Sequence, residues 1–250
     1  MKKNVVLLFG GQSTEHDISR RSVMTFVEHI DRDLYEVYTV GITREGSWRL
    51  FEGDHERIMA DTWVESSTQA LLSPDATNGG LLIFRDSGIE QVAVDVVVPV
   101  LHGLFGEDGS VQGLLRLAQI PYVGCGILAS AVAMDKFYTK LVVGPLGIRQ
   151  ANYVGVIEED YHRENIAEEV TERLGFPVYV KPSNAGSSIG VSRAVDVATL
   201  HEALLLAFKH DRKVLVEESI VGREVECAVI GNLEVTASDV GEIIACLLYT

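Results

Sequence analysis

The sequence predicts an α/β protein with a doubly wound N-terminal domain and a second α/β domain behind it. Over residues 1–42 the order is strand, glycine turn, helix, strand, which is how a doubly wound sheet begins. Short aliphatic runs then alternate with helical patterns along the rest of the chain. A chain of 250 residues can hold two modest domains.

Composition excludes several classes of function. Hydrophobic residues at 47% and charged residues at 23% are typical of a globular protein. The net charge of −15, without a basic cluster, argues against a nucleic-acid-binding surface. No apolar stretch is long enough to span a membrane, and the three scattered cysteines lack metal-ligand spacing. We therefore expect a cytoplasmic protein that binds neither nucleic acid nor membrane.

The first 42 residues are expected to form a strand, a turn, a helix and a second strand. Residues 5–9 are a continuous apolar run, typical of a strand buried on both faces. A glycine turn follows, and then four apolar residues lie at helical spacing: Val23, Phe26, Val27 and Ile30. The second strand is expected over residues 35–42. The glycines do not spell G-x-G-x-x-G and no acidic residue closes the second strand, so a dinucleotide site is not expected.

The next part of the chain is less regular. Residues 48–80 are polar, and we expect surface excursions with a loop over residues 66–79. Further strands are expected over residues 81–84 and 92–101. The second of these ends in His102, and residues after a strand's C-terminal end are where ligands meet open α/β sheets.

The second half begins after a glycine loop and a helix over residues 111–117. Residues 121–124 indicate a turn and a domain boundary. A helix is expected over residues 129–143, a strand over 153–156 and a second helix over about 163–174.

A loop of small residues then follows Lys181, at the end of an apolar run over residues 176–180. Small residues let backbone N–H groups approach a ligand closely, and hydroxyls add donors, so the loop suits a phosphate. Lys181 can act as a point charge on the same phosphate chain. The lysine precedes the loop and a β-like run over residues 189–192 follows it, unlike a P-loop. We expect a hairpin flap over nucleotide phosphates; a plain Gly/Ser-rich hairpin turn is the alternative.

The remaining elements end in acidic residues and a turn. Asp196 is expected to N-cap a helix through Phe208. A strand over residues 214–216 leads into Glu217 and Glu218, and a further strand over residues 224–230 precedes a Gly-Asn hairpin turn.

Five motifs along the chain resemble the ATP-grasp ligases and, within them, the D-alanine–D-alanine ligases. In order they are Gly10-Gly11-Gln12-Ser13-Thr14-Glu15-His16, His102-Gly103-x-x-Gly106-Glu107-Asp108-Gly109-x-x-Gln112-Gly113, Met134-Asp135-Lys136, Lys181-Pro182 with Gly186-Ser187-Ser188, and Glu217-Glu218 with Gly222-Arg223-Glu224. The resemblance implies an N-terminal substrate-binding domain over residues 1–123 and a central ATP-grasp subdomain over 124–219. Residues 220–250 would begin a C-terminal ATP-grasp subdomain.

The resemblance implies ATP-dependent ligation of two D-alanines through a D-alanyl phosphate, for peptidoglycan synthesis. It implies that Glu15 accepts the ammonium of the first D-alanine, that His102 lies near its carboxylate and that Ser187 helps orient it. The residues implied for ATP are Lys136 and Lys181 on the phosphates, Ser187 and Ser188 in the flap, Glu217 on the adenine amino group, Glu218 and Ile220 through their backbones, and Glu224 on the ribose.

Each of these residues also has a plainer explanation when taken alone. A lysine is most often a solvated surface charge, and Glu15 could be an acid of the first helical turn interacting with the helix dipole. His102 could be a structural hydrogen-bonding residue, and the glutamates could be strand-end acids in water.

The family's third domain carries the ligands of two magnesium (or manganese) ions, a transition-state arginine and the loop that selects the second substrate. Residues 220–250 are too few to hold it, so we expect a C-terminally truncated chain without activity. Residues 246–250 depart from the family; a sequencing-adapter artefact is one hypothesis, and a genuine final strand over residues 243–249 is the other.

The resemblance leaves the second substrate open, since D-alanine–D-lactate and D-alanine–D-serine ligases share these motifs. It implies a homodimer through the N-terminal domain. A naturally short, non-catalytic nucleotide-binding protein is the alternative from another class, and a Rossmann oxidoreductase is a more distant one.

Overall fold

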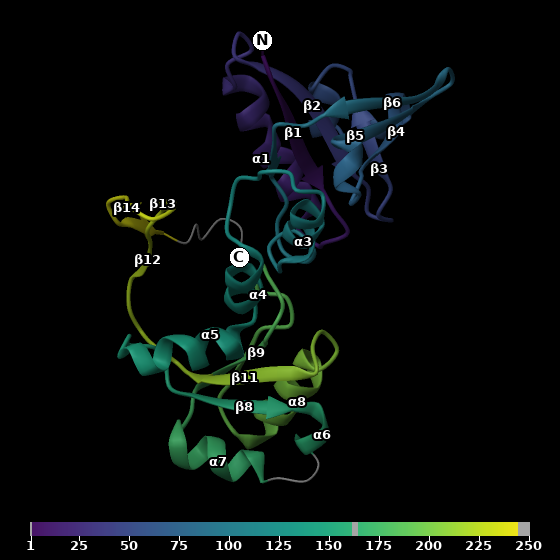
Figure 1. Ribbon diagram of the computed structural model, residues 1–250. Helices are drawn as coiled ribbons and strands as arrows, with labels where there is room; N and C mark the ends of the chain where they lie inside the picture. The colour runs from purple at the N-terminus through teal and green to yellow at the C-terminus, as the bar shows by residue number, and fades with distance from the viewer. Residues whose placement is uncertain (1, 162–164, 245–250) are drawn as a thin grey trace.

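The computed structural model describes residues 2–161 and 165–244 and contains two sheet domains joined through a helix (Figure 1). A seven-stranded sheet forms the first domain and a four-stranded sheet forms the second. Helix α4 (Ile127–Met134) lies between them in Figure 1. Among the helices of the described ranges, none has the length and apolar character that a membrane crossing requires.

The N-terminal sheet has the order β6-β5-β4-β3-β2-β1-β7, with parallel pairs at the β7 end and antiparallel pairs towards β6. Strand β1 (Lys3–Gly10) pairs in parallel with β2 (Tyr35–Ile42) and with the edge strand β7 (Val96–Pro99). The antiparallel strands are β3 (Trp48–Phe51), β4 (Ser67–Leu72), β5 (Gly80–Arg85) and β6 (Gly88–Ala93). The helical segments of this domain are α1 (His16–His29), α2 (Glu56–Met59), η1 (Trp63–Ser66), η2 (Ala76–Asn78) and α3 (Ser110–Leu117).

Strand β1 is buried on both faces, as its continuous apolar run predicts. Val6 and Leu8 belong to a core cluster that includes Val111 and Leu115 of α3. The alternate residues Val5, Leu7 and Phe9 belong to a second cluster, which includes Val23 of α1. Helices therefore cover both faces of this sheet, which confirms the doubly wound arrangement.

Two predictions for this domain were wrong in part. The surface excursions expected over residues 48–80 include the half-buried strand β3, and the loop expected over residues 66–79 contains strand β4. Ala70 and Leu72 of β4 are buried, but three polar residues precede them and hide the strand pattern. The single strand expected over residues 92–101 is two, because the chain leaves β6 and turns before β7. Asp95 fixes that turn, because its Oδ2 accepts a hydrogen bond from the backbone N–H of Asn4 at 2.7 Å.

The second domain is a four-stranded sheet in the order β10-β9-β11-β8, with antiparallel neighbours throughout. Its elements are α5 (Lys136–Val143), η3 (Gly144–Leu146), β8 (Tyr153–Ile157), α6 (Glu158–Tyr161), α7 (Ile166–Arg173), β9 (Val178–Pro182), β10 (Ser192–Ala194), α8 (Val197–Ala207) and β11 (Lys213–Glu218). Val178, Val180, Val214 and Val216 pack against α7 and α8 on one face. The alternate residues Tyr179, Lys181 and Glu217 therefore point to the opposite face, on which α5 lies (Figure 1).

The helix expected over residues 129–143 is broken in two at Asp135. This residue has an extended backbone, with φ −85° and ψ 102°, and it caps α5 by accepting from the N–H groups of Phe137 and Tyr138. The predicted cap at Asp196 is confirmed and forms a capping box with Thr199. The hairpin after Lys181 is also present, since β10 pairs with β9, but residues 189–191 form a turn and not a strand.

The last described segment lies apart from both sheets (Figure 1). The strand expected over residues 224–230 is two short ones, β12 (Glu224–Glu226) and β13 (Val229–Gly231). Strand β13 forms the predicted hairpin with β14 (Val235–Ala237), and β12 pairs with β15 (Gly241–Ile243). The two hypotheses for residues 246–250, an adapter artefact and a final strand to residue 249, concern positions outside the described residues.

Candidate functional site

The flap of the second domain, residues 183–191 between β9 and β10, contacts the N-terminal domain at Glu15. This residue follows β1 and precedes α1, and its Oε1 accepts a hydrogen bond from Ser187 Oγ at 2.5 Å. Ser13 connects the same point to the loop after β7, because its hydroxyl accepts from the N–H of Glu15 and donates to the carbonyl oxygen of His102 at 2.7 Å. Three loops that are distant in the sequence thus meet around one carboxylate.

The backbone around this carboxylate leaves no room for side chains. A Cβ on Gly186 would lie 2.6 Å from Glu15 Oε2, and one on Gly103, whose φ is +68°, would also collide with it. In the flap itself Ser187 and Ser188 both have left-handed backbones, with φ of +46° and +58°. Such strain clusters at ligand clamps and switch regions.

His102 lies after β7 and pairs with an acidic neighbour. Its Nδ1 is 3.7 Å from Glu107 Oε1, and its Nε2 lies 3.0 Å from Ser22 Oγ. Interaction with Glu107 raises the pKa of His102, against the effect of its partial burial. The same interaction is the main cause of the lowered pKa of Glu107. Glu107 was missed as a candidate, although it stands in the glycine-rich motif that begins with His102.

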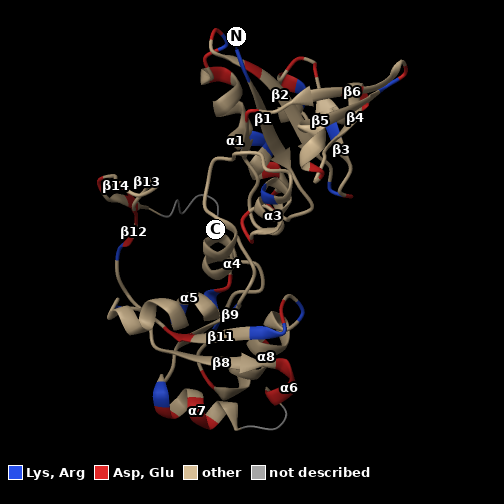
Figure 2. Cartoon of the chain, in the orientation of Figure 1, with Lys and Arg blue, Asp and Glu red and all other residues tan. Residues whose placement is uncertain are grey.

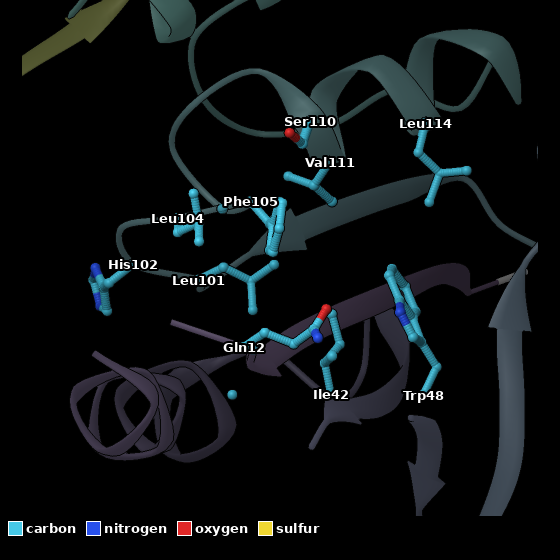
Figure 3. Close-up of a pocket in the computed structure, with 13 residues that line it drawn as sticks. Gln12, Ile42, Trp48, Leu101, His102, Leu104, Phe105, Ser110, Val111 and Leu114 are labelled. Atoms are coloured by element: carbon cyan, nitrogen blue, oxygen red, sulfur yellow. The ribbon is translucent and has the colours of Figure 1, made fainter. Parts of the chain in front are cut away.

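An apolar pocket of about 190 Å³ lies beside His102, at the C-terminal ends of β1 and β2 (Figure 3). Gln12, Ile42 and Trp48 line one side, and the loop and helix after β7 line the other. The pocket therefore occupies the edge of a doubly wound sheet at which ligands commonly bind.

Lys136, the first residue of α5 in the same domain, holds the flap. Its Nζ donates to the carbonyl oxygens of Ala185 at 2.6 Å and Ser183 at 3.4 Å. Burial, followed by the nearby charge of Lys181, lowers the pKa of Lys136. It is thus not the solvated surface lysine of the plainer explanation.

Asp135 connects the start of α5, the flap and β11. Its Oδ1 accepts from Ser183 Oγ at 2.5 Å, and its Oδ2 accepts from Asn184 Nδ2 and pairs with Lys213. Burial alone would raise the pKa of Asp135, but the Lys213 ammonium and the Ser183 hydroxyl outweigh it and lower the pKa. The carboxylate therefore stays ionised and fixes Lys136 beside the flap.

Glu217 is only 8% exposed and lies between two lysines. Its Oε2 is 2.5 Å from Lys181 Nζ and its Oε1 is 3.0 Å from Lys140 Nζ. Burial alone would raise the pKa of Glu217, but the two ammonium groups outweigh it and lower the pKa. Lys140 was missed by sequence reasoning; its spacing of four residues from Lys136, on one helix, is the signal that could have found it.

The other residues expected to bind ATP do not lie around Glu217 and its two lysines. Glu218 Oε1 accepts from the backbone N–H of Asn152 at 2.7 Å. Ile220 is 68% exposed, Glu224 is an exposed residue of β12, and Ser188 is exposed in the flap. The structure therefore joins Glu15 to Ser187 and Lys181 to Glu217, but leaves Ile220 and Glu224 in solvent.

The charge pattern of the site favours an anionic ligand. Lys136 and Lys181 lie beside a flap of small residues on the sheet face that α7 and α8 leave free, an arrangement suited to a phosphate chain. Elsewhere acidic and basic segments are mixed on both domains (Figure 2). In residues 2–161 and 165–244, no three His, Cys, Asp or Glu side chains are placed to hold a metal ion.

Comparison with known proteins gives the family. Residues 4–125 match the D-ala D-ala ligase N-terminus and residues 142–247 match the D-ala D-ala ligase C-terminus. The D-alanine–D-alanine ligase of Acetivibrio thermocellus is 45% identical over 97% of this chain and 69% of its own length. That of Ruminiclostridium cellulolyticum is 46% identical over 98% of this chain and 68% of its own length.

Solved structures agree with these relatives. The VanG D-Ala:D-Ser ligase of Enterococcus faecalis superimposes with a TM-score of 0.89 at 36% identity, covering 97% of this chain and 70% of that one. The D-alanine–D-alanine ligase of Coxiella burnetii gives 0.88 at 33% identity, covering 97% and 71%. The chain therefore belongs to the D-alanine–D-alanine ligase family.

Proposed function

We propose that the protein joins two D-alanines at the expense of ATP, for peptidoglycan synthesis. The observation that supports this most is that one flap contacts both Glu15, through Ser187, and Lys136, through the carbonyl oxygen of Ala185. The chain that carries this arrangement is 45% identical to a D-alanine–D-alanine ligase. The first D-alanine's carboxylate attacks the γ-phosphorus of ATP and ADP leaves. The second D-alanine's amine then attacks the acyl phosphate, and phosphate leaves as the peptide bond forms.

In this proposal the carboxylate of Glu15 accepts the ammonium of the first D-alanine, and Ser187 orients that substrate. Lys136 and Lys181 bind the phosphates of ATP, because positioning and charge neutralisation supply most of the catalysis of phosphoryl transfer. His102 lies at the same loop junction as Glu15 and takes the place near the substrate carboxylate.

The rest of the proposed nucleotide site lies along β11 and beyond it. The carboxylate of Glu217 accepts from the adenine amino group, and Glu218 and Ile220 make backbone contacts. Ser188 closes over the phosphates and Glu224 binds the ribose; both are exposed here.

Magnesium (or manganese) at two ions per active site stays a prediction from the family resemblance. The described residues supply no set of ligands for it, so we assign no step of this chain to the metal. We also propose a homodimer through the N-terminal domain and a cytoplasmic location.

The proposed domain limits are residues 1–123, 124–219 and 220–250. The separate hydrophobic cores of the two sheets support the boundary between the first two domains.

The second substrate separates two candidate activities. The curated relatives cited above are D-alanine–D-alanine ligases at 45–46% identity, whereas the VanG D-Ala:D-Ser ligase matches the fold closely at 36% identity. D-Alanine is therefore the first candidate and D-serine the second, with D-lactate as a further acceptor to test.

The test uses the full-length product of the native gene. ADP release is measured with D-alanine alone and with D-serine or D-lactate added, and products are identified by mass spectrometry, with L-alanine as control. We expect D-alanyl-D-alanine as the product. Lys181→Met should reduce kcat/KM by about 100-fold or more. Absence of any ATP-dependent dipeptide or depsipeptide from the full-length product would contradict the proposal.

A further inference from the structure

Two lysines from different elements hold the carboxylate of Glu217. Lys181 of β9 lies 2.5 Å from Oε2, and Lys140 of α5 lies 3.0 Å from Oε1. The Glu217 side chain is 11% exposed, so neither oxygen depends on water for its partners. A buried carboxylate with a cation on each oxygen is ionised and fixed in orientation.

The two lysines are not equivalent. The Lys140 side chain is 10% exposed; its Nζ also donates to the carbonyl oxygen of Ala151 at 3.0 Å and lies 5.0 Å from the centre of the Tyr153 ring. The Lys181 side chain is 31% exposed. Lys181 can therefore turn towards an incoming anion, whereas Lys140 is enclosed by its partners and must stay.

We propose that Lys140 is a positioning residue that makes the nucleotide site select a 6-amino purine. It holds Oε1 of Glu217 while Lys181 turns to the nucleotide phosphates, which frees Oε2 to accept a hydrogen bond from the amino group. This inference rests on the proposed function for the binding of a nucleotide, and it assigns the choice of base to a residue that does not touch the base.

The selection follows from the charge of Glu217. An ionised carboxylate can only accept hydrogen bonds, so it binds the amino group of adenine and repels the 6-oxo group of hypoxanthine. When Lys181 turns away, the charged groups still facing Glu217 are Lys140 and, at the start of α5, Lys136. Without Lys140 the buried carboxylate would lose its direct cation and bind a proton more readily, and a protonated carboxyl can donate to a 6-oxo group.

The experiment compares ADP with IDP, whose bases differ at this position while their phosphates are the same. Isothermal titration calorimetry on the full-length product of the native gene measures Kd for both nucleotides. We expect Lys140→Met to weaken ADP binding about tenfold and IDP binding by less than about twofold, because one charge-assisted hydrogen bond is lost for ADP alone. Lys140→Arg keeps the cation and should restore most of the preference for ADP.

Lys213→Met is the matched control. Lys213 also pairs with a buried carboxylate, that of Asp135, and lies 4.4 Å from the centre of a tyrosine ring. Its loss should change the two Kd values by the same factor, since it has no contact with Glu217. In steady state Lys140→Met should raise KM for ATP about tenfold and change kcat by less than about threefold.

Equal weakening of both nucleotides by Lys140→Met, or no change in either, would overturn the proposal. If Lys140→Met does not fold, Lys140→Gln, whose amide can still donate to Ala151, is used for the same comparison. A wild-type protein that binds ADP but forms no D-alanyl product would contradict the proposed function and leave this comparison valid. A wild-type protein that binds neither nucleotide would contradict both.

Discussion

The two sheets of this protein differ in what covers their faces. Strand β1 of the N-terminal sheet directs alternate side chains into two apolar cores and is buried along most of its length. In the second domain, the valines of β9 and β11 pack into one apolar core, and the opposite face, on which α5 lies, carries Lys181 and Glu217. The candidate site therefore lies in loops beyond the strand ends in one domain, and on the sheet face itself in the other.

The difference has a physical cause. A strand buried on both faces has no side chain left for chemistry, so residues that contact ligands must lie past its C-terminal end. A strand buried on one face alternates, and every second side chain is free to bind. Charges on that face, which α5 partly covers, are paired with one another, as Lys140, Lys181 and Glu217 are.

The largest effect on stability should come from a substitution in β1, the strand that is buried on both faces. Leu7→Ala removes a fully buried side chain from β1 and should lower the free energy of unfolding by about 2–5 kcal/mol. Both tryptophans, Trp48 and Trp63, lie in the N-terminal domain, so tryptophan fluorescence in a urea titration reports on that domain.

The control for this prediction is Leu204→Ala. Leu204 is just as fully buried, but in the core of the second domain. It should shift the tryptophan transition much less if each domain unfolds around its own core. Equal shifts for both variants would show that the two sheets unfold as one unit.

A smaller effect is expected where the second domain places a buried charge. Asp135→Ala removes the cap of α5, the acceptor of the Ser183 hydroxyl and the partner of Lys213. We expect a loss of about 3 kcal/mol, because the lysine is left without its counter-charge. Thermal unfolding followed by far-ultraviolet circular dichroism measures it.

Asp196→Ala supplies the comparison, since Asp196 caps α8 in the same way but on the exposed surface. Its loss should cost about 1 kcal/mol. A cost for Asp135→Ala no greater than this would mean that the connections of Asp135 to the flap and to β11 add nothing to stability.

A still smaller effect is expected in the flap, which lies between the two domains and contacts Glu15. In Gly186→Ala the new methyl group would meet the Glu15 carboxylate at 2.6 Å and should push the flap away from it. We expect KM for the first D-alanine to rise about tenfold, equivalent to about 1.4 kcal/mol. Initial-rate measurements with the full-length product of the native gene test this.

Gly113→Ala is the matched control for Gly186→Ala. A Cβ on Gly113 meets nothing within 4 Å in helix α3, so this variant should keep the wild-type KM and gain a little stability. An unchanged KM in Gly186→Ala would show that the flap does not act on the first substrate through Glu15.

The same difference between the sheets explains which features could be predicted from the sequence. The continuous apolar run of β1 and the capping signal at Asp196 are local patterns, and both were confirmed. The break at Asp135 was missed because helical residues stand on either side of it, so the helical pattern continues across it. The break depends on contacts with Ser183 and Lys213, which are distant in the sequence.

The site shows the same limit. The motifs place Lys181 and Glu217 within their strands, but nothing in either motif indicates that the two side chains pair across neighbouring strands. Lys140 was missed because its importance comes from this pairing and not from its own motif. Similarly, the contact of Ser187 with Glu15 joins residues far apart in the chain.

The smallest effect should come from the His102–Glu107 pair, at the loop edge of the N-terminal sheet. The raised pKa of His102 means that folding favours its protonated form, so this stabilisation is complete below about pH 6.5 and is lost as the pH rises through the raised pKa. The lowered pKa of Glu107 gives stabilisation that is present above about pH 4.5 and lost on acidification. The pair therefore stabilises the fold most between about pH 4.5 and pH 6.5. Its contribution is less than about 1 kcal/mol, because the Glu107 side chain is half exposed.

Glu107→Gln tests the pair through the titration of histidine ring protons by NMR. The pKa of His102 should fall in the variant, while that of His16, which burial lowers, should stay in place. The difference in unfolding free energy between wild type and variant should be largest near pH 6 and vanish at alkaline pH. An unmoved His102 titration would mean that its charge is set by Glu15 or by burial. The loop after β7 in the N-terminal domain would then lack a charge pair of the kind that holds Lys140, Lys181 and Glu217 in the second domain.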